Sequence, residues 1–264
     1  MRSILFVPGD RPERFDKACA CGAGAVIIDL EDAVAPADKA RARDALADWL
    51  QPERAVLVRI NAAGTPWFDD DLALLAHVSG VAGIVLPKAE CPEEVAAVAT
   101  CAPVFPLIES AFGLSQVLSI GKVAGIRRLI FGSVDFQLDL GIRGDGPELS
   151  FFRSQLVWMS RLAGLAAPID GVTTILDDTE QLAQDAQRSR AMGFGGKLCI
   201  HPRQVSVVNQ AFAPTAEEEA WARRVLAAAS SEEGAVRLDG QMIDRPVVLR
   251  AQAIINEIAA RGIQ

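Results

Sequence analysis

Histidine is scarce in this sequence, which contains only His77 and His201 among its 264 residues. The five cysteines are scattered, and the closest pair, Cys19 and Cys21, would point to different faces of a helix. Because structural zinc sites combine about four closely spaced Cys and His ligands, we expect no zinc site. Scattered cysteines, odd in number, are typical of reduced thiols, so we expect a cytoplasmic protein.

Long apolar runs and basic runs are also missing. No stretch approaches the roughly 18 uninterrupted apolar residues of a membrane helix, and the apolar start ILFV is shorter than the core of about 7 to 15 residues in a secretory signal. Acidic side chains outnumber basic ones by 34 to 26, which gives a formal net charge of -8. No basic run with interleaved aromatics occurs, so we expect neither a membrane nor nucleic acid as a partner.

Two catalytic motifs are absent. The sequence has no GxSxG nucleophile elbow, and the glycine-flanked segment GSVDFQLDLG lacks the spacing of a phosphate-binding or dinucleotide-binding loop. Serine hydrolysis and nucleotide hydrolysis are therefore disfavoured. Half of the residues are hydrophobic, as in globular proteins, and the length suits a single barrel of roughly 250 residues.

Short apolar runs recur along the chain with a regular rhythm. Their starts lie about 20 to 40 residues apart, which leaves room for one helix after each run. Such near-continuous apolar strands are typical of parallel sheets covered on both faces. Eight strand-and-helix units favour an α/β fold of the (β/α)₈ TIM-barrel type over an open doubly wound sheet. The eight runs begin at Ser3, Ala25, Ala55, Gly83, Val104, Arg128, Ala167 and Lys197.

Helix signals support this assignment and extend it. The clearest helix has Asp177 or Asp178 to cap its start and Gly193 to end it, and Gly164 ends another. Further helices are predicted after the eighth run, from Pro202, over about 216–229, and in a last segment reaching about Ala260. We therefore expect a barrel over 1–212 and a helical extension over 213–264 that packs on the barrel or on a neighbouring subunit.

Polar residues follow every apolar run. In a (β/α)₈ barrel the active site lies at the carboxyl ends of the strands, so these residues are candidates for chemistry. In chain order they are the segment PGDR, then Asp29, Glu31, Asp32, Arg59, Asn61, Pro87, Lys88, Glu109, Asp135, Asp170 and His201.

Glu109 and Asp135 follow adjacent strands, so both carboxylates can face one point at the barrel mouth. Mg²⁺ is typically held by one or two carboxylates together with water and substrate oxygens. The alternative is that Arg59 or Lys88 neutralises the pair. Arg59 itself either binds a substrate carboxylate with its planar fork or forms a structural salt bridge with Glu109.

The remaining candidates also have two interpretations each. Glu31 and Asp32 either hold water molecules around the metal or are solvated turn residues. Lys88 either forms a Schiff base with a carbonyl substrate or is a charge partner, which is the commoner role of such a lysine. For His201, which precedes Pro202, a structural role at a helix start is favoured over acid–base catalysis.

Eight ordered sequence blocks extend over nearly the whole chain, to about Ala260, and together they resemble the citrate lyase beta-subunit-like proteins of the HpcH/HpaI aldolase superfamily. The blocks are RSILFVPGDRPERFDKA, IIDLEDAVAPADKARAR, VRINAAGTPWFDDDL, GIVLPKAE, PLIESAFGL, FGSVDFQLDLG, GFGGKLCIHPRQ and DGQMIDRP. The resemblance implies a (β/α)₈ barrel, often a homotrimer, that uses Mg²⁺ to cleave or form a carbon–carbon bond between an acyl thioester and a 2-oxoacid.

Site residues follow from the resemblance block by block. Glu109 of PLIES and Asp135 of GSVD match the metal ligands, and Arg59 of VRIN matches the carboxylate clamp. Glu31 and Asp32 of DLED belong with Arg59 to the catalytic set.

Substrate contacts are also implied. Backbone amides of Gly132, Ser133, Val134 and Asp135 would hold the oxoacid carboxylate, and Arg14 and Lys17 are candidates for the coenzyme A phosphates.

Asp244 of QMIDRP resembles an acid/base aspartate that malyl- and citramalyl-CoA lyases supply from a neighbouring subunit. The alternative role for Asp244 is to cap the last helix.

Two departures from the family pattern do not touch the metal site, and the bulk in the second of them either narrows the pocket or only repacks its helix. Gly24 stands where an aspartate is more usual, and Trp158 and Met159 are bulkier than the usual residues of their helix. The leading hypothesis is a Mg²⁺-dependent lyase for a citramalyl-, malyl- or citryl-CoA type substrate. The alternatives are a citryl-lyase subunit acting on an acyl carrier protein, a catalytically silent oxoacid-binding subunit and a Schiff-base aldolase using Lys88.

Overall fold

The computed structural model describes residues 1–231, 236–238 and 240–259. The chain divides into two compact units, Met1–Phe212 and Ala213–Gln264. Among the described residues, no helix is both long enough and apolar enough to cross a membrane. Five cysteines of the described chain are free thiols.

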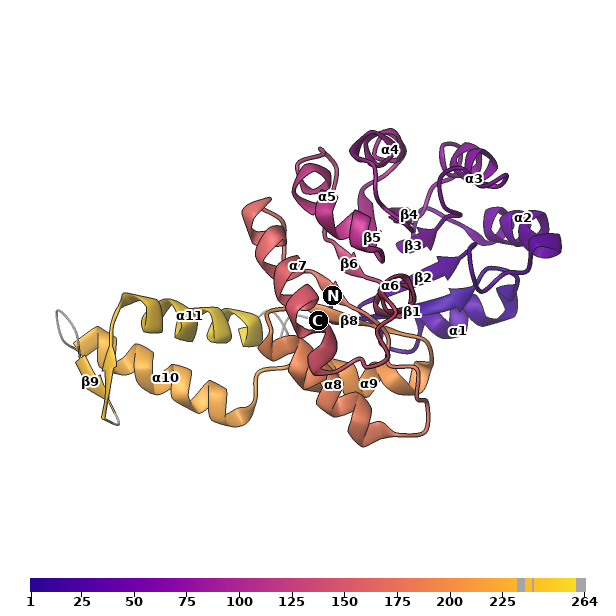
Figure 1. Cartoon of the computed structure of the whole chain (residues 1–264). Helices are drawn as coiled ribbons and strands as arrows, with labels where there is room; N and C mark the ends of the chain where they lie inside the picture. Colours follow the sequence, from indigo (N-terminus) through magenta and orange to yellow (C-terminus); the bar gives the residue numbers. More distant parts are fainter. Residues whose placement is uncertain (232–235, 239, 260–264) are drawn as a thin grey trace. The chain divides into compact units, whose positions relative to one another are not determined.

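The first unit is a closed barrel of parallel strands, as the sequence predicts (Figure 1). Each strand pairs with the next along the chain, and β8 pairs with β1 to close the ring. β6 and β7 are shorter than their predicted apolar runs. Within Met1–Phe212 the strands are β1 Ser3–Pro8, β2 Ala25–Asp29, β3 Val56–Arg59, β4 Val81–Leu86, β5 Val104–Ile108, β6 Ile130–Phe131, β7 Ile169–Asp170 and β8 Gly196–Cys199.

Alternate residues of the strands fill two separate cores. Side chains such as Ile27 and Leu57 pack inside the barrel, in a cluster to which all the strands of the ring contribute. Their neighbours Val26, Ile28 and Val58 belong to a larger cluster between the strands and the helices. This alternation explains the near-continuous apolar runs, because both faces of each strand are buried.

Helices surround the strands (Figure 1). Asp178 accepts a hydrogen bond from the Gln181 N–H at 2.9 Å and caps α8, while Gly193 follows that helix with a φ of 99°, as predicted. The helices of this unit are η1 Pro12–Arg14, α1 Phe15–Cys19, η2 Pro36–Asp38, α2 Lys39–Trp49, α3 Phe68–Leu75, α4 Pro92–Val98, α5 Ala111–Gly121, α6 Ser133–Leu140, η3 Pro147–Leu149, α7 Ser150–Leu162, α8 Thr179–Ala191 and α9 Pro202–Ala211.

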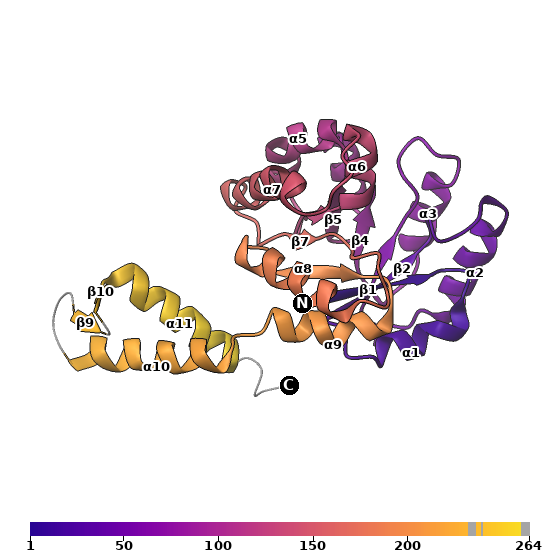
Figure 2. The same cartoon turned by 60° about the horizontal axis from the view of Figure 1, so that its bottom comes forward.

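The second unit is a helical hairpin with a small antiparallel sheet (Figure 2). α10 packs along α11 around a core that includes Ala222, Ile243 and Ala251. The sequence predicts both helices but not the two strands; the predicted helix end at Ala260 lies outside the described residues. The elements are α10 Ala216–Ser231, β9 Val236–Leu238, β10 Gln241–Ile243 and α11 Arg245–Ala259.

Candidate functional site

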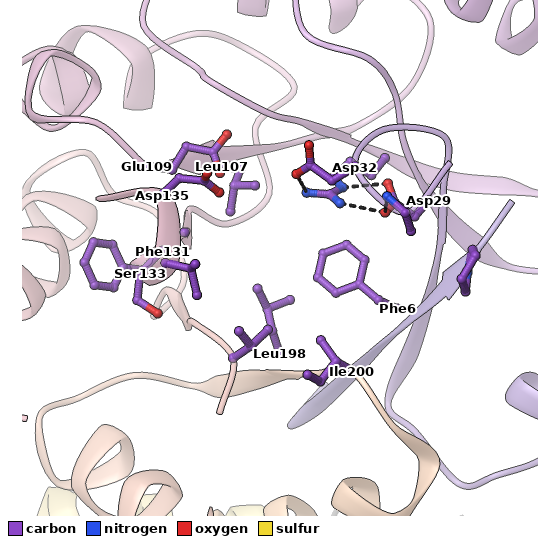
Figure 3. A pocket seen from close by; sticks show the side chains of 16 residues that line it. Phe6, Asp29, Asp32, Leu107, Glu109, Phe131, Ser133, Asp135, Leu198 and Ile200 are labelled. Atoms are coloured by element: carbon purple, nitrogen blue, oxygen red, sulfur yellow. Dashed lines mark hydrogen bonds and ion pairs between the residues drawn. The ribbon is translucent and has the colours of Figure 1, made fainter. Parts of the chain in front are cut away.

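A cavity of about 400 Å³ opens at the carboxyl ends of the barrel strands. Carboxylates and one arginine line one part of it, and apolar side chains line the rest (Figure 3). The lining residues are Phe6, Pro8, Asp29, Asp32, Ala33, Arg59, Leu107, Glu109, Phe131, Gly132, Ser133, Val134, Asp135, Val172, Leu198 and Ile200.

Glu109 and Asp135 lie side by side in this cavity (Figure 3). Glu109 follows β5 and is 5% exposed, whereas Asp135 lies in the first turn of α6 and is half-buried. The Lys88 backbone N–H donates to Glu109 Oε1 at 2.7 Å. Gly132 leaves room for the same carboxylate, because a Cβ at position 132 would lie 2.6 Å from Glu109 Oε2. The structure thus brings together the two predicted metal ligands.

The carboxylates in this part of the cavity are short of positive charge. Burial, followed by the charge of Glu31, raises the pKa of Glu109 to about 8. Burial also raises the pKa of Glu31 to about 7, against the opposing effect of Arg59. A cation beside Glu109 and Asp135 would offset the free-energy cost of ionising the buried Glu109, since an opposite charge favours the ionised carboxylate.

The oxygen-only donor set suits Mg²⁺. The described residues contain no group of three or more His, Cys, Asp or Glu side chains arranged around one metal position. Glu109 and Asp135 supply two carboxylates, the number that Mg²⁺ commonly takes from a protein while keeping water and substrate oxygens as its other ligands.

Arg59 is held in place by Asp29. Its Nε donates to Asp29 Oδ1 at 2.7 Å and its Nη2 to Asp29 Oδ2 at 2.6 Å. Its Nη1 lies 3.0 Å from Glu31 Oε2 and 3.3 Å from Asp32 Oδ2. The alternative of a salt bridge between Arg59 and Glu109 is therefore wrong, because Asp29 occupies that role.

The hydrogen bonds to Asp29 also limit how Arg59 can bind a substrate carboxylate. A guanidinium offers one bidentate edge through Nε and Nη2 and a second through Nη1 and Nη2. Asp29 occupies the first edge, so only the second edge of Arg59 remains for a substrate carboxylate, partly shared with Glu31 and Asp32.

Sequence reasoning noted Asp29 but gave it no role. Asp29 and Arg59 are register partners in the neighbouring strands β2 and β3, so an acid and a base at matched strand ends would have been the signal. Asp29 also accepts hydrogen bonds from the backbone N–H groups of Glu31 and Ala33. One carboxylate therefore fixes both Arg59 and the turn that carries Glu31.

Lys39 completes that turn, and sequence reasoning missed it. Its Nζ donates to the Leu30 and Glu31 carbonyl oxygens, both at 2.7 Å. Glu31 is buried, whereas the Asp32 side chain is 64% exposed. The alternative of a solvated turn thus describes Asp32 but not Glu31.

The predicted oxoacid amides lie at the junction between β6 and α6. The Gly132 N–H donates to the Ile108 carbonyl at 2.9 Å, so it serves the barrel and not a ligand. Ser133, Val134 and Asp135 form the first turn of α6, where backbone N–H groups have no acceptor within the helix. These three residues line the cavity, and Gly132 contributes close packing.

Arg14 and Lys17 line a neighbouring cavity of about 330 Å³, and both are exposed. That cavity shares Phe6, Pro8 and Ile200 with the main one. The two predicted phosphate-binding residues therefore lie together, beside the barrel mouth.

His201 borders the Arg14 cavity and caps α9. Its Nδ1 accepts a hydrogen bond from the Arg203 N–H at 3.2 Å, which is the favoured structural role. Lys88 is exposed and has a φ of 47°. Its exposure argues against a Schiff base, since that chemistry needs a desolvated amine.

Asp170 and Asp244 each have a hydrogen-bond or ion-pair partner within their own compact unit. Asp170 is fully buried and pairs with Arg153 at 3.0 Å, so the expectation that it faces the mouth is wrong. Asp244 belongs to the second unit, is exposed, and accepts a hydrogen bond from the Val247 N–H at 3.2 Å. It therefore caps α11, and its carboxylate is also open to solvent.

Comparisons of the sequence and of the structure with known proteins indicate the same family. Residues 2–202 match the family model described as HpcH/HpaI aldolase/citrate lyase. A citrate lyase subunit beta-like protein of Mycobacterium tuberculosis is 41% identical over 260 residues, covering 96% of this chain and 93% of that protein. A (3S)-malyl-CoA thioesterase of Cereibacter sphaeroides is 32% identical over 272 residues, covering 98% and 95%. The crystal structure of the protein CitE from Mycobacterium tuberculosis in complex with magnesium, acetoacetate and coenzyme A covers 98% of each chain at 38% identity, with a TM-score of 0.89.

Proposed function

This chain belongs to the HpcH/HpaI aldolase/citrate lyase family, and on that premise we propose that it is a Mg²⁺-dependent carbon–carbon lyase. Its substrate would be a 3-hydroxyacyl-CoA thioester of the citramalyl, malyl or citryl type, cleaved to acetyl-CoA and a 2-oxoacid. The observation that carries the proposal is the pairing of buried Glu109 with Asp135 at the barrel mouth, in the cavity that Arg59 also lines.

Glu109 and Asp135 would hold the metal. When bound, Mg²⁺ supplies Lewis acidity that stabilises negative charge on the substrate's hydroxyl and carbonyl oxygens during bond cleavage. Lys88 contributes its backbone N–H, which keeps the Glu109 carboxylate oriented before the substrate arrives. Glu31 and Asp32 would accept hydrogen bonds from water at the edge of the site.

Arg59 would orient the carboxylate of the 2-oxoacid. Asp29 fixes its guanidinium plane through two hydrogen bonds, so the remaining Nη1–Nη2 edge, partly shared with Glu31 and Asp32, keeps one direction in the cavity. The N–H groups of the first turn of α6 face the same developing product, and a helix N-terminus favours a carboxylate. Arg59 and α6 thus position the oxoacid half of the substrate.

The thioester half needs a different part of the surface. Arg14 and Lys17 would bind coenzyme A phosphates beside the cavity that connects to the mouth. Cleavage releases an enolate of the acetyl thioester, and a general acid must protonate its carbon. Asp244 would donate that proton, and in the reverse direction it would remove it.

An oligomer would bring Asp244 from one copy to the site of another. The α7 side chains of Phe151, Trp158 and Leu162 are 63%, 55% and 56% exposed, and their spacing puts them on one face of the helix. Such an exposed apolar face favours burial against another protein surface. We take the occupant to be a second copy within a homotrimer, in the cytoplasm.

The decisive experiment measures release of pyruvate, glyoxylate or oxaloacetate from citramalyl-CoA, malyl-CoA or citryl-CoA. We expect release from at least one thioester with Mg²⁺ and none with EDTA. Release that survives EDTA would contradict the metal-dependent mechanism. If no thioester is cleaved but the oxoacids still bind with Mg²⁺, the proposed lyase is wrong for coenzyme A substrates, and the same assay with citryl-acyl-carrier protein separates a carrier-protein lyase from a silent subunit.

A further inference from the structure

A second, polar cavity of about 250 Å³ adjoins the main one. The two cavities share Ser133, Val134 and Val172, so this polar cavity begins where the first turn of α6 meets the strand-end segment after β7. None of the roles assigned above uses it. Its other lining residues are Gln137, Asp145, Gly146, Thr173, Thr174, Ile175, Gln181, Asp185 and Arg188.

One face of α8 forms part of the wall. Gln181, Asp185 and Arg188 are spaced by four and three residues, which places them on the same side of the helix. Asp185 is buried, and it accepts hydrogen bonds from Gln181 Nε2 at 2.9 Å and from Thr173 Oγ1 at 2.8 Å. Arg188 Nη2 donates to Asp185 Oδ1 at 2.9 Å.

The acids of the polar cavity already have partners. Asp145 accepts from Arg153 Nη2 at 2.7 Å, and both oxygens of Asp185 accept hydrogen bonds. A ligand group that donates hydrogen bonds, such as a hydroxyl, therefore finds little free acceptor capacity there.

Two hydrogen-bond donors of the polar cavity, in contrast, have no acceptor. Ser133 Oγ and Arg188 Nε are buried polar atoms without a hydrogen-bond partner, and Ser133 is only 2% exposed. Figure 3 shows the Ser133 hydroxyl turned away from the Glu109 and Asp135 carboxylates. A buried polar group without a partner costs free energy, so these two donors suit a ligand that brings acceptors.

From this arrangement we infer that the polar cavity binds a second carboxylate, carried on the side chain of the 2-oxoacid. This inference rests on the proposed function and narrows it to dicarboxylic 2-oxoacids. The first carboxylate would lie at Arg59 and α6, and the side chain would pass Ser133 and Val172 to reach Arg188. Pyruvate and glyoxylate lack the group that this cavity would bind.

The test compares Mg²⁺-dependent binding of pyruvate, oxaloacetate and 2-oxoglutarate by calorimetry. We expect at least one dicarboxylate to bind more tightly than pyruvate. Arg188→Gln should lower the ratio of dicarboxylate affinity to pyruvate affinity by about tenfold, the effect of losing one charge-assisted hydrogen bond. Ser133→Ala should lower the same ratio, by about threefold or more.

Arg41→Gln is the matched control, because Arg41 pairs with Asp38 three residues away at 3.0 Å, as Arg188 pairs with Asp185, but lies exposed on α2. It should leave the ratio unchanged. Equal losses for pyruvate and the dicarboxylates in both cavity variants would overturn the inference and leave Arg188 a structural role. So would wild-type protein that binds pyruvate at least as tightly as both dicarboxylates. If no oxoacid binds in the presence of Mg²⁺, the proposed function is wrong. If oxoacids bind without a preference for dicarboxylates, only the present inference is wrong.

Discussion

At the scale of single residues, Glu109 is a predicted metal ligand whose burial lowers the stability of the metal-free protein above its ordinary pKa. Its carboxylate is buried beside Asp135 and Glu31, and burial together with the charge of Glu31 raises its pKa to about 8. Folded protein therefore retains a proton on Glu109 that unfolded protein releases above its ordinary pKa of 4.5. By linkage, metal-free stability falls as the pH rises from 4.5 towards 8, and bound Mg²⁺ would reverse that loss.

A Glu109→Gln substitution tests both halves of this argument. Glutamine can still accept the Lys88 N–H but carries no charge, so the metal-free variant should melt at a higher temperature than wild type at pH 8. It should bind Mg²⁺ at least about a hundredfold more weakly, since even supporting residues of metal sites cost up to that factor. Calorimetry and thermal melts with and without Mg²⁺ check this. Equal Mg²⁺ stabilisation in both proteins would remove Glu109 from the metal site.

At the scale of elements, the junction of β6 with α6 contacts Glu109 and carries Asp135. Gly132 joins the barrel through the Ile108 carbonyl, and its missing side chain makes space for Glu109. The next residues start the helix that carries Asp135. One short connection therefore sets the separation of the two carboxylates.

Gly132→Ala should disturb that junction. A Cβ at this position would lie 2.6 Å from Glu109 Oε2, so the carboxylate must move, whereas no positive φ needs to be lost. We expect Mg²⁺ affinity and turnover to fall by about tenfold or more, because metal sites tolerate little displacement of their ligands. Circular dichroism should show an intact barrel. Wild-type Mg²⁺ affinity in this variant would mean that Glu109 has room to shift.

The barrel was predictable because each strand is buried on both faces and leaves a continuous apolar run, as in Ala25–Asp29. The β9–β10 hairpin was missed because its strands have three residues each, although the Asp-Gly pair at 239–240 is a hairpin signal. The only sequence signal for the Asp29–Arg59 pairing was an acid and a base at matched strand ends, and the polar cavity had none. Both depend on strand register and on side chains reaching across elements, such as Arg188 and Ser133, which periodicity does not encode.

At the scale of the whole molecule, the proposed chemistry needs both compact units. The carboxylate pair belongs to Met1–Phe212, whereas Asp244 belongs to Ala213–Gln264. Asp244 caps α11 within its own unit, so its substitution affects a helix end as well as any proton transfer. A test of its catalytic role therefore has to separate these effects.

Mixing two inactive variants does so. Glu109→Gln lacks the metal ligand, and Asp244→Asn keeps the length of the capping side chain but loses its acid. Each alone should lose turnover while Asp244→Asn retains Mg²⁺ and oxoacid binding. If Asp244 acts on a neighbouring copy, unfolding and refolding them together in equal amounts should restore about a quarter of the wild-type sites, by random pairing of copies. No recovery in the mixed sample would place Asp244 in its own subunit's site, whereas unchanged turnover of Asp244→Asn alone would leave it only a cap.

The fixed plane of the Arg59 guanidinium restricts which mirror-image form of a substrate can bind. Because Asp29 occupies one edge of the guanidinium, a carboxylate can meet the other edge from only one direction. The Glu109–Asp135 pair defines a second direction from the same carbon, and the polar cavity past Ser133 defines a third. Three unlike attachments in fixed directions distinguish a molecule from its mirror image, so the barrel mouth would accept one configuration at the hydroxyl-bearing carbon and reject the other.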